Sequence, residues 1–192
     1  MDVRDADDVT AKVAECADRL GPIQICVANA GVLNHRPFHR LSLDDWRATM
    51  ATNLDGAFLT IQAAMRSMRL VDWGRVITVA SLSGRQGLSN GAAYAASKQG
   101  LVGLTRALSE EYLGSPYTFN ALCPGPVDTP MAERKLRKPG VAPLDALNEI
   151  AEENRHNRLL SPDEVAAAAL WLCGPGSESV NGQSIDLTGG PA

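Results

Sequence analysis

The feature that most constrains this sequence is an alternation of short apolar runs with longer segments of helical periodicity. Four runs rich in aliphatic residues end at glycine, proline or small polar residues, and they predict strands at 23–28, 76–80, 117–122 and 183–187. Strands that alternate with helices in this way favour a parallel sheet covered on both faces. We therefore predict a doubly wound parallel α/β (Rossmann-like) sheet.

The segments between these strands carry helix signals. Ser42 is a candidate N-cap for a helix whose apolar positions continue through 44–69, and a second helix is predicted over about 92–112. Ser161 followed by a proline is a strong start for an alanine-rich helix that ends near Cys173.

The prolines in the second half of the chain predict breaks in regular structure. The run Pro124-Gly125-Pro126 is expected to end the third strand at residue 122, because proline interrupts both helices and central strands. The charged residues 128–160 contain three further prolines, so we expect a long lid-like excursion with helical pieces there.

Composition excludes several classes of protein. The chain has 192 residues, the length of one domain (1–192), and a formal net charge of −4, which fits neither nucleic acid nor an anionic membrane as partner. The longest apolar run, residues 165–172, is far shorter than the ~18 residues that a membrane span needs. The four cysteines lie far apart, with no C-x-x-C pair. The first ten residues lack an apolar stretch, so we expect a reduced, cytoplasmic chain with no secretory signal.

The ends of the predicted strands carry the residues that suggest chemistry. Asn29-Ala30-Gly31 follows the first strand, Ser81 the second, and Pro124-Gly125 the third. Ligands of parallel sheets bind at the carboxyl ends of the strands, so these segments should meet at one site. Tyr94 and Lys98 are spaced i, i+4 at the start of the next predicted helix and share one of its faces.

A tyrosine beside a lysine can act as a general acid and base. A free phenol has a pKa of ~10, and an ammonium about 4 Å away favours the phenolate by roughly 4 kcal/mol, or ~3 pKa units. This predicts a pKa near ~7 for Tyr94, where proton transfer is most effective. Ser81 could then polarise a carbonyl oxygen that receives the proton. Together the three side chains could interconvert an alcohol and a ketone.

These motifs resemble those of the short-chain dehydrogenase/reductase family, and the resemblance covers residues 2–190. It implies an oxidoreductase that uses NAD or NADP and no metal. The catalytic residues that it implies are Asn53, Ser81, Tyr94 and Lys98. The cofactor-binding residues that it implies are Asp2, Val3, Asn29, Ala30, Gly31, Tyr94, Lys98, Pro124, Gly125, Val127 and Thr129.

The resemblance also implies a role for each catalytic residue. Tyr94 would be the acid and base, and Lys98 would lower its pKa and hold the nicotinamide ribose. Ser81 would orient the substrate carbonyl, and the backbone carbonyl of Asn53 would hold a water relay to the lysine. The implied substrate is a 3-oxoacyl or other small hydroxy or keto compound. Because the family's long helices pack against their symmetry mates, a homo-oligomer (dimer or tetramer) is expected.

One departure from the family pattern concerns the phosphate-binding turn. No T-G-x-x-x-G-x-G turn is present, although such a turn brings the backbone and a helix N-terminus to the cofactor pyrophosphate. Asp2-Val3 resembles the family's adenine-contacting pair at the end of its third strand. The sheet should therefore lack its first two to three strands, which leaves strand 23–28 as an apolar edge.

The alternative to hydride transfer is a catalytically impaired remnant that only assembles with full-length relatives.

Two clusters have simpler interpretations. His35 and His39 lie at i, i+4 without a third ligand nearby, which favours a solvated loop over a metal site. The basic residues of 134–138 could meet the phosphates of a coenzyme A thioester, but a solvated helix face is the better interpretation.

Overall fold

The sheet of this computed structural model, which describes residues 1–132 and 151–190, is parallel throughout. Its strands lie in the order β1-β2-β3-β4. They are β1 (Ile25–Ala28), β2 (Gly74–Val79), β3 (Tyr117–Pro124) and β4 (Ser184–Leu187). The predicted parallel α/β sheet is confirmed, with β1 at one edge.

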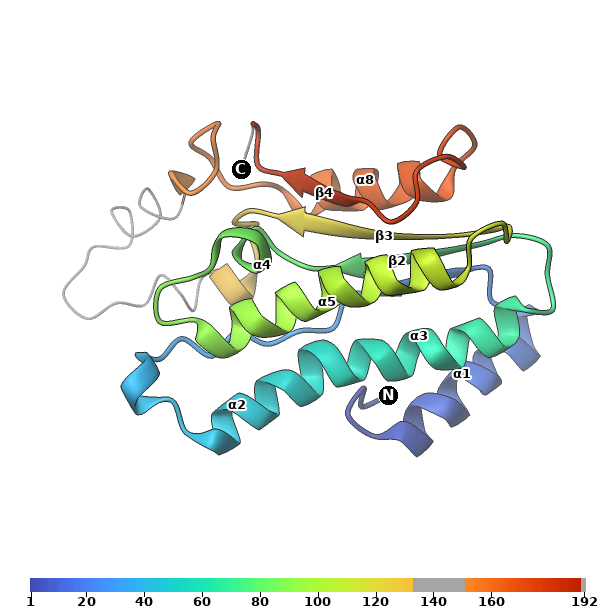
Figure 1. Ribbon diagram of the computed structural model, residues 1–192, viewed down its shortest axis with the longest axis horizontal. Helices are drawn as coiled ribbons and strands as arrows, with labels where there is room; N and C mark the ends of the chain where they lie inside the picture. Colours follow the sequence, from blue (N-terminus) through green and yellow to red (C-terminus); the bar gives the residue numbers. More distant parts are fainter. Residues whose placement is uncertain (133–150, 191–192) are drawn as a thin grey trace.

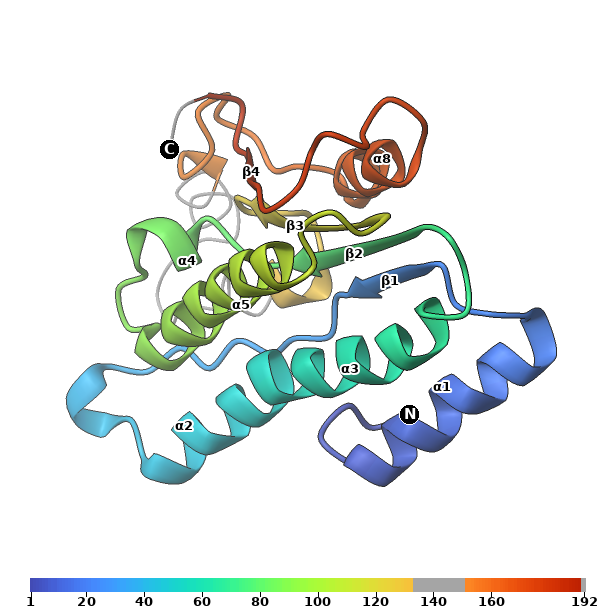
Figure 2. The ribbon, with the colours of Figure 1, turned by 45° about the vertical axis from the view of Figure 1, so that its right-hand side comes forward.

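Helices cover both faces of this sheet (Figures 1 and 2). On one face lie α3 (Gly56–Met68) and α5 (Ala92–Glu111), and on the other lies α8 (Pro162–Cys173). The start of α8 is as predicted, because Ser161 and Glu164 form a reciprocal capping box. The three-layer arrangement is that of a doubly wound sheet.

Two apolar clusters fill the spaces between these layers. The larger one packs β1, β2 and β3 against α3 and α5, with Met68, Leu101 and Phe119 at most 1% exposed. The smaller one joins the opposite face to α8 through Ile77, Leu122 and Leu172. Neighbouring residues of a strand thus face opposite clusters, so the continuous apolar runs of the sequence belong to strands buried on both faces.

The strand limits differ from the predicted ones at all four strands. β2 spans Gly74–Val79 instead of 76–80, and β4 begins at Ser184 instead of residue 183. β1 begins at Ile25 instead of residue 23, and β3 runs on to Pro124 instead of ending at residue 122. Pro124 closes the strand without breaking it, because it is the terminal residue, where the missing N–H costs little. Its carbonyl still accepts a hydrogen bond from the Leu82 N–H at 2.8 Å.

The helix predicted over 44–69 is interrupted. Helix α2 (Leu43–Met50) passes into a π-helical turn, η2 (Ala51–Asp55), before α3 begins. The turn is marked by the Gly56 N–H, which bonds to the carbonyl of Ala51 five residues earlier. Single π-helical turns inside α-helices often occur at functional sites. Here the turn holds Asn53, which is fully buried.

Helix α1 (Ala6–Leu20) was not predicted, although its start is signalled in the sequence. Asp5 is its N-cap, and the carboxylate accepts the backbone N–H groups of Asp7 and Asp8. The helix packs along α3, and its Val9 is completely buried.

Two short elements complete the description, η1 (Phe38–Arg40) and the one-turn helix α4 (Ser83–Gln86), where a loop was predicted. Most of the predicted lid falls on residues 133–150, outside the described residues. After it the chain returns to the sheet, where Leu160 pairs with Val127 in an isolated parallel bridge. None of the described helices is both long and apolar enough to cross a membrane.

Candidate active site

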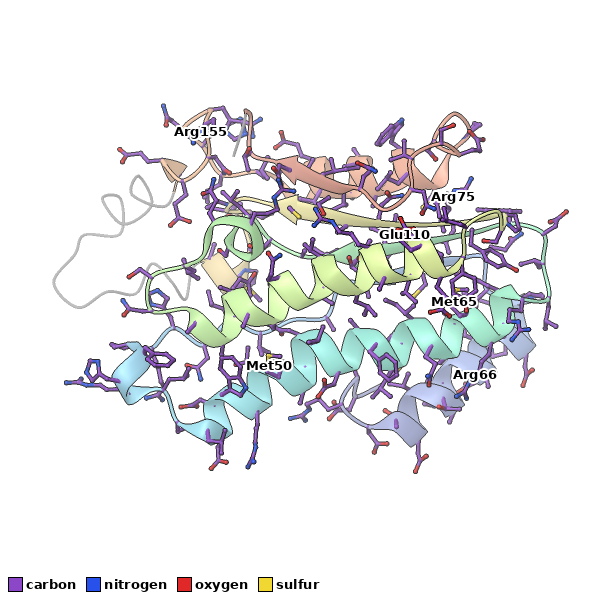
Figure 3. The ribbon with its side chains drawn as sticks, viewed as in Figure 1. Met50, Met65, Arg66, Arg75, Glu110 and Arg155 are labelled. Atoms are coloured by element: carbon purple, nitrogen blue, oxygen red, sulfur yellow. The ribbon has the colours of Figure 1, made fainter. Side chains whose placement is uncertain are left out.

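A cavity of about 950 Å³ opens where the carboxyl ends of β1, β2 and β3 meet. This is the left-hand end of the sheet in Figure 1, toward which the strand arrows point. Figure 3 places Arg155 at this end, whereas Arg75, at the amino end of β2, lies at the other. Ligands of parallel sheets bind at this edge.

The cavity brings together most of the predicted site residues. Those that line it are Asn29, Ala30, Gly31, Ser81, Tyr94, Lys98, Pro124, Gly125, Val127 and Thr129. Asn53, Asp2 and Val3 do not line it. The wall also contains residues that the sequence did not single out: Leu33, Val79, Ala80, Leu82, Ser83, Gln86, Gly87, Leu88, Ser89, Pro126, Pro130, Met131, Ala132, Glu153, Pro162 and Val165.

Ser81 and Tyr94 both line this cavity, although Ser81 follows β2 and Tyr94 lies on the first turn of α5. The Ser81 side chain is close enough to the Tyr94 phenol to favour its charged form. The Ser81 hydroxyl oxygen accepts the N–H of Ser83 at 3.1 Å, so α4 fixes its orientation. Two different elements therefore bring these two side chains to the wall of the same cavity.

Lys98 lies behind Tyr94, one turn further along α5. Its side chain is only 4% exposed, and its Nζ donates a hydrogen bond to the carbonyl of Val79 at 2.7 Å. Nζ lies 5.6 Å from the centre of the Tyr94 ring, on a face of the ring where a cation is attracted. Burial lowers the pKa of Lys98 to about 8, because desolvation disfavours the ammonium.

The predicted pKa of Tyr94 near ~7 is not what the structure gives. Burial disfavours the phenolate and raises the pKa of Tyr94 above its ordinary value, while the side chain of Ser81 opposes this shift. The prediction assumed an ammonium about 4 Å away. The ammonium of Lys98 instead faces the Val79 carbonyl, so burial prevails. Tyr94 is therefore a protonated donor at neutral pH.

Asn53 supports the site from outside the cavity. Its Oδ1 accepts the Val32 N–H at 2.8 Å, and its Nδ2 donates to the Val32 carbonyl at 3.0 Å. These bonds attach the π-helical turn to the loop that follows β1. A Cβ built on Gly31 would lie 3.3 Å from Lys98 Nζ and 3.5 Å from Asn53 Oδ1, so glycine allows this loop to approach both side chains.

Asp2 and Val3 lie away from the cavity, on the α1 side of the sheet. The carboxylate of Asp2 is exposed and receives the guanidinium of Arg4, which lowers the pKa of that carboxyl. Val3 packs on the start of α3, where a Cβ on Gly56 would come within 2.7 Å of its Cγ2.

Asn154 is a site-supporting residue that sequence reasoning missed. It is fully buried, and its Nδ2 donates to the carbonyls of Pro126 at 3.0 Å and Arg158 at 2.7 Å. Its Oδ1 has no hydrogen-bond partner and lies against Gly125, where a Cβ would overlap it. Asn154 thus clamps the cavity segment 124–127 to the chain that returns from residue 151. Only the tertiary fold brings these segments together, so no sequence pattern signals the clamp.

Comparisons with known proteins find relatives that match nearly the whole chain. A family model described as enoyl-(acyl carrier protein) reductase matches residues 1–191. An acetoacetyl-CoA reductase of Shinella zoogloeoides is 33% identical over 190 residues, which span 98% of this chain and 76% of that protein. A crystal structure of an actinorhodin polyketide ketoreductase with NADPH gives a TM-score of 0.92 at 34% identity, over 98% of this chain and 75% of that one.

A further crystal structure carries the family name in its description. It is a short-chain dehydrogenase/reductase, described as glucose/ribitol dehydrogenase, from Brucella melitensis. It is 33% identical, with a TM-score of 0.89 over 99% of this chain and 74% of that one. This chain is a short-chain dehydrogenase/reductase.

Membership in the short-chain dehydrogenase/reductase family makes the chain an NAD(P)-dependent oxidoreductase that acts on alcohols and ketones. The relatives favour this interpretation over an impaired remnant that only assembles with others. The residues fit the nicotinamide half of such a cofactor, because the cavity has a volume of about 950 Å³ and Tyr94 and Lys98 lie on its wall beside the loop 29–31. When bound, the nicotinamide supplies or accepts the hydride.

Proposed function

We propose that the cavity of this dehydrogenase/reductase reduces a small ketone, such as a 3-oxoacyl compound, and that it oxidises the corresponding alcohol in the reverse direction. The observation that supports this is that Ser81 and Tyr94, with Lys98 behind the Tyr94 ring, all lie on the wall of one cavity. A protonated phenol, a second hydroxyl and a buried ammonium are the groups that ketone reduction requires.

Four residues divide the tasks of the proposed mechanism among them. The hydroxyl of Ser81 donates a hydrogen bond to the substrate carbonyl oxygen and orients the carbonyl carbon for hydride transfer. Tyr94 gives its phenolic proton to the same oxygen as negative charge develops there, which is general acid catalysis. In the oxidation direction Tyr94 takes this proton back. Lys98 contributes positive charge beside the phenolate that forms and holds the nicotinamide ribose, while Asn53 supports a water relay to Lys98.

The wall of the cavity favours an uncharged acyl or alkyl chain beside the reacting carbonyl. Leu33, Leu88 and Met131 line the same cavity as Ser81 and Tyr94 and contribute apolar side chains to its wall. The acetoacetyl-CoA reductase among the relatives acts on a 3-oxoacyl thioester. We therefore choose acetoacetyl-CoA as the first substrate to assay.

Replacement of Tyr94 tests the proposal. Tyr94→Phe removes the acidic proton and keeps the ring, so we expect turnover of acetoacetyl-CoA with NADPH or NADH to be lost and cofactor binding to be kept. Tyr112→Phe is the matched control, because Tyr112 lies at the other end of α5 and packs on Tyr117 and Phe119, away from the cavity. Activity retained by Tyr94→Phe would refute the assignment.

We also propose a homo-oligomer located in the cytoplasm. The outer surfaces of α2 and α3 carry exposed apolar side chains, with Leu43 60% and Phe58 45% exposed, which favours contact with a second copy. A monodisperse monomer by light scattering at micromolar concentration would contradict the oligomer, and cell fractionation tests the location.

A further inference from the structure

Ser97 lies between the two residues that the proposed mechanism uses on α5, and it makes no contact with the cavity. It is three residues after Tyr94 and one before Lys98, and its side chain is completely buried. Its hydroxyl donates to the Tyr94 backbone carbonyl at 2.7 Å and accepts from Asn53 Nδ2 at 3.0 Å. One hydroxyl therefore joins the turn of α5 that carries the acid to the π-helical turn η2.

The Asn53 amide depends on this bond. A primary amide has two N–H donors. One bonds to the Val32 carbonyl and the other to the Ser97 hydroxyl, while Oδ1 accepts the Val32 N–H. Since Asn53 is itself fully buried, loss of the Ser97 hydroxyl would leave one N–H without a partner and without access to water.

The same network extends to Lys98 through the loop after β1. Asn53 fixes Val32, the residue that follows Gly31. Gly31 packs between the Asn53 amide and the Lys98 ammonium, because a Cβ there would lie within 3.5 Å of both. The hydroxyl of Ser97 thus contacts the backbone carbonyl of Tyr94 directly. It is linked to Lys98 indirectly, through Asn53 and Gly31.

A purely local role for Ser97 would be to satisfy a helix carbonyl, and the chain contains a residue that does only this. Ser109, near the end of the same helix, is also buried, and its hydroxyl donates to the carbonyl three residues earlier, that of Arg106, at 2.8 Å. Ser97 differs in its second bond, to the side chain of Asn53.

We propose that Ser97 is a positioning residue, which holds Asn53 and the loop after β1 in register with the Tyr94–Lys98 turn through its two hydrogen bonds. This inference rests on the proposed function, because it assigns importance to the place of Tyr94 and Lys98. It concerns the alignment of these groups and assigns Ser97 no contact with substrate.

The experiment compares Ser97→Ala with Ser109→Ala in steady-state reduction of acetoacetyl-CoA. Misplacement of reacting groups by about 1 Å can lower a rate by about a hundredfold, so we expect kcat of Ser97→Ala to fall by at least about tenfold. Both KM values should change little, because the cavity wall is intact. Ser109→Ala should keep wild-type kcat. An unchanged kcat for Ser97→Ala, or an equal loss in both variants, would overturn the inference.

Hydrogen exchange supplies a readout that does not need activity. In Ser97→Ala we expect faster amide exchange at Val32 and over 53–56, with no such change in Ser109→Ala. Unchanged exchange at Val32 would overturn the inference even if the wild-type protein showed no turnover. Faster exchange in a chain whose wild type does not reduce acetoacetyl-CoA would support the positioning role and refute the proposed substrate.

Discussion

Replacement of Asn154 by aspartate should destabilise the protein in a strongly pH-dependent manner. Asn154→Asp keeps the shape of the side chain but exchanges the Nδ2 donor for an oxygen. That oxygen would face the carbonyls of Pro126 and Arg158, which both now accept from Nδ2. Among the described residues, no donor bonds to Oδ1, which lies against Gly125. The introduced carboxyl therefore fits this buried site only in its protonated form.

The size of the effect follows from the proton that the folded chain must keep. A protonated carboxyl restores one of the two donated bonds, so at low pH the cost is about 1 kcal/mol. An aspartate in the unfolded chain has a pKa of about 3.9, and each pH unit above that value costs about 1.4 kcal/mol to keep the folded carboxyl neutral. The added cost is about 1.5 kcal/mol at pH ~5 and about 4 kcal/mol at pH ~7. This cost is a large share of the free energy of unfolding of a typical domain, which is roughly 5–15 kcal/mol.

Urea unfolding at these two pH values measures the difference. The folded pKa of the introduced carboxyl is raised, so stability is lost as pH rises, and the gap to the wild type should widen from about pH 5 to about pH 7. Asn181→Asp is the matched control, because the Asn181 Oδ1 accepts the Phe119 N–H and a carboxylate preserves that bond. A gap for Asn154→Asp that stays constant or narrows with rising pH would refute the clamp as described.

Three further outcomes follow from the same structure. Ketone reduction should decline as pH rises through about 8, because Lys98 then loses its charge, and a rate profile that stays flat well above this pH would contradict that role. Mass spectrometry after alkylation should find Cys16 modified first and Cys26 and Cys123 last, since both of the latter are buried and burial raises the pKa of each to about 11; early modification of Cys123 would disprove this order. Ser161→Ala removes half of the capping box of α8 and should lower the free energy of unfolding by about 1 kcal/mol, whereas an unchanged urea midpoint would show that the cap contributes nothing.

The elements that the sequence predicted well are those with a strong local signal. Apolar runs bounded by turn residues placed all four strands, and Ser161 with its following proline placed α8. The start of α1 has an equally clear signal in Asp5, so that helix was open to prediction. The π-helical turn at Asn53 was not, because one extra residue in a helical turn changes the apolar spacing too little to be recognised.

The site was predictable in its composition and less so in its electrostatics. The strand-end rule and the spacing of Tyr94 and Lys98 correctly anticipated that these side chains would share a cavity with Ser81. The predicted shift of the Tyr94 pKa was wrong in direction. The sequence shows neither the burial of the phenol nor the Val79 carbonyl that accepts a hydrogen bond from the Lys98 ammonium. The roles of Ser97 and Asn154 depend on contacts between distant segments, which no local pattern encodes.

The two buried groups of the site shift in opposite directions, and this decides which proton the unliganded protein can give. Burial raises the pKa of Tyr94 and lowers that of Lys98 to about 8, because in each case it disfavours the charged form. At neutral pH the phenol therefore holds its proton while the lysine is still mainly charged, which is the state that ketone reduction needs. As pH rises the lysine loses its proton before the tyrosine does, so a phenolate beside an ammonium is not a resting state of this site. That charge pair is favoured only as the proton leaves Tyr94 for the substrate oxygen, so the attraction of Lys98 for the phenolate acts on the transition state more than on the resting enzyme.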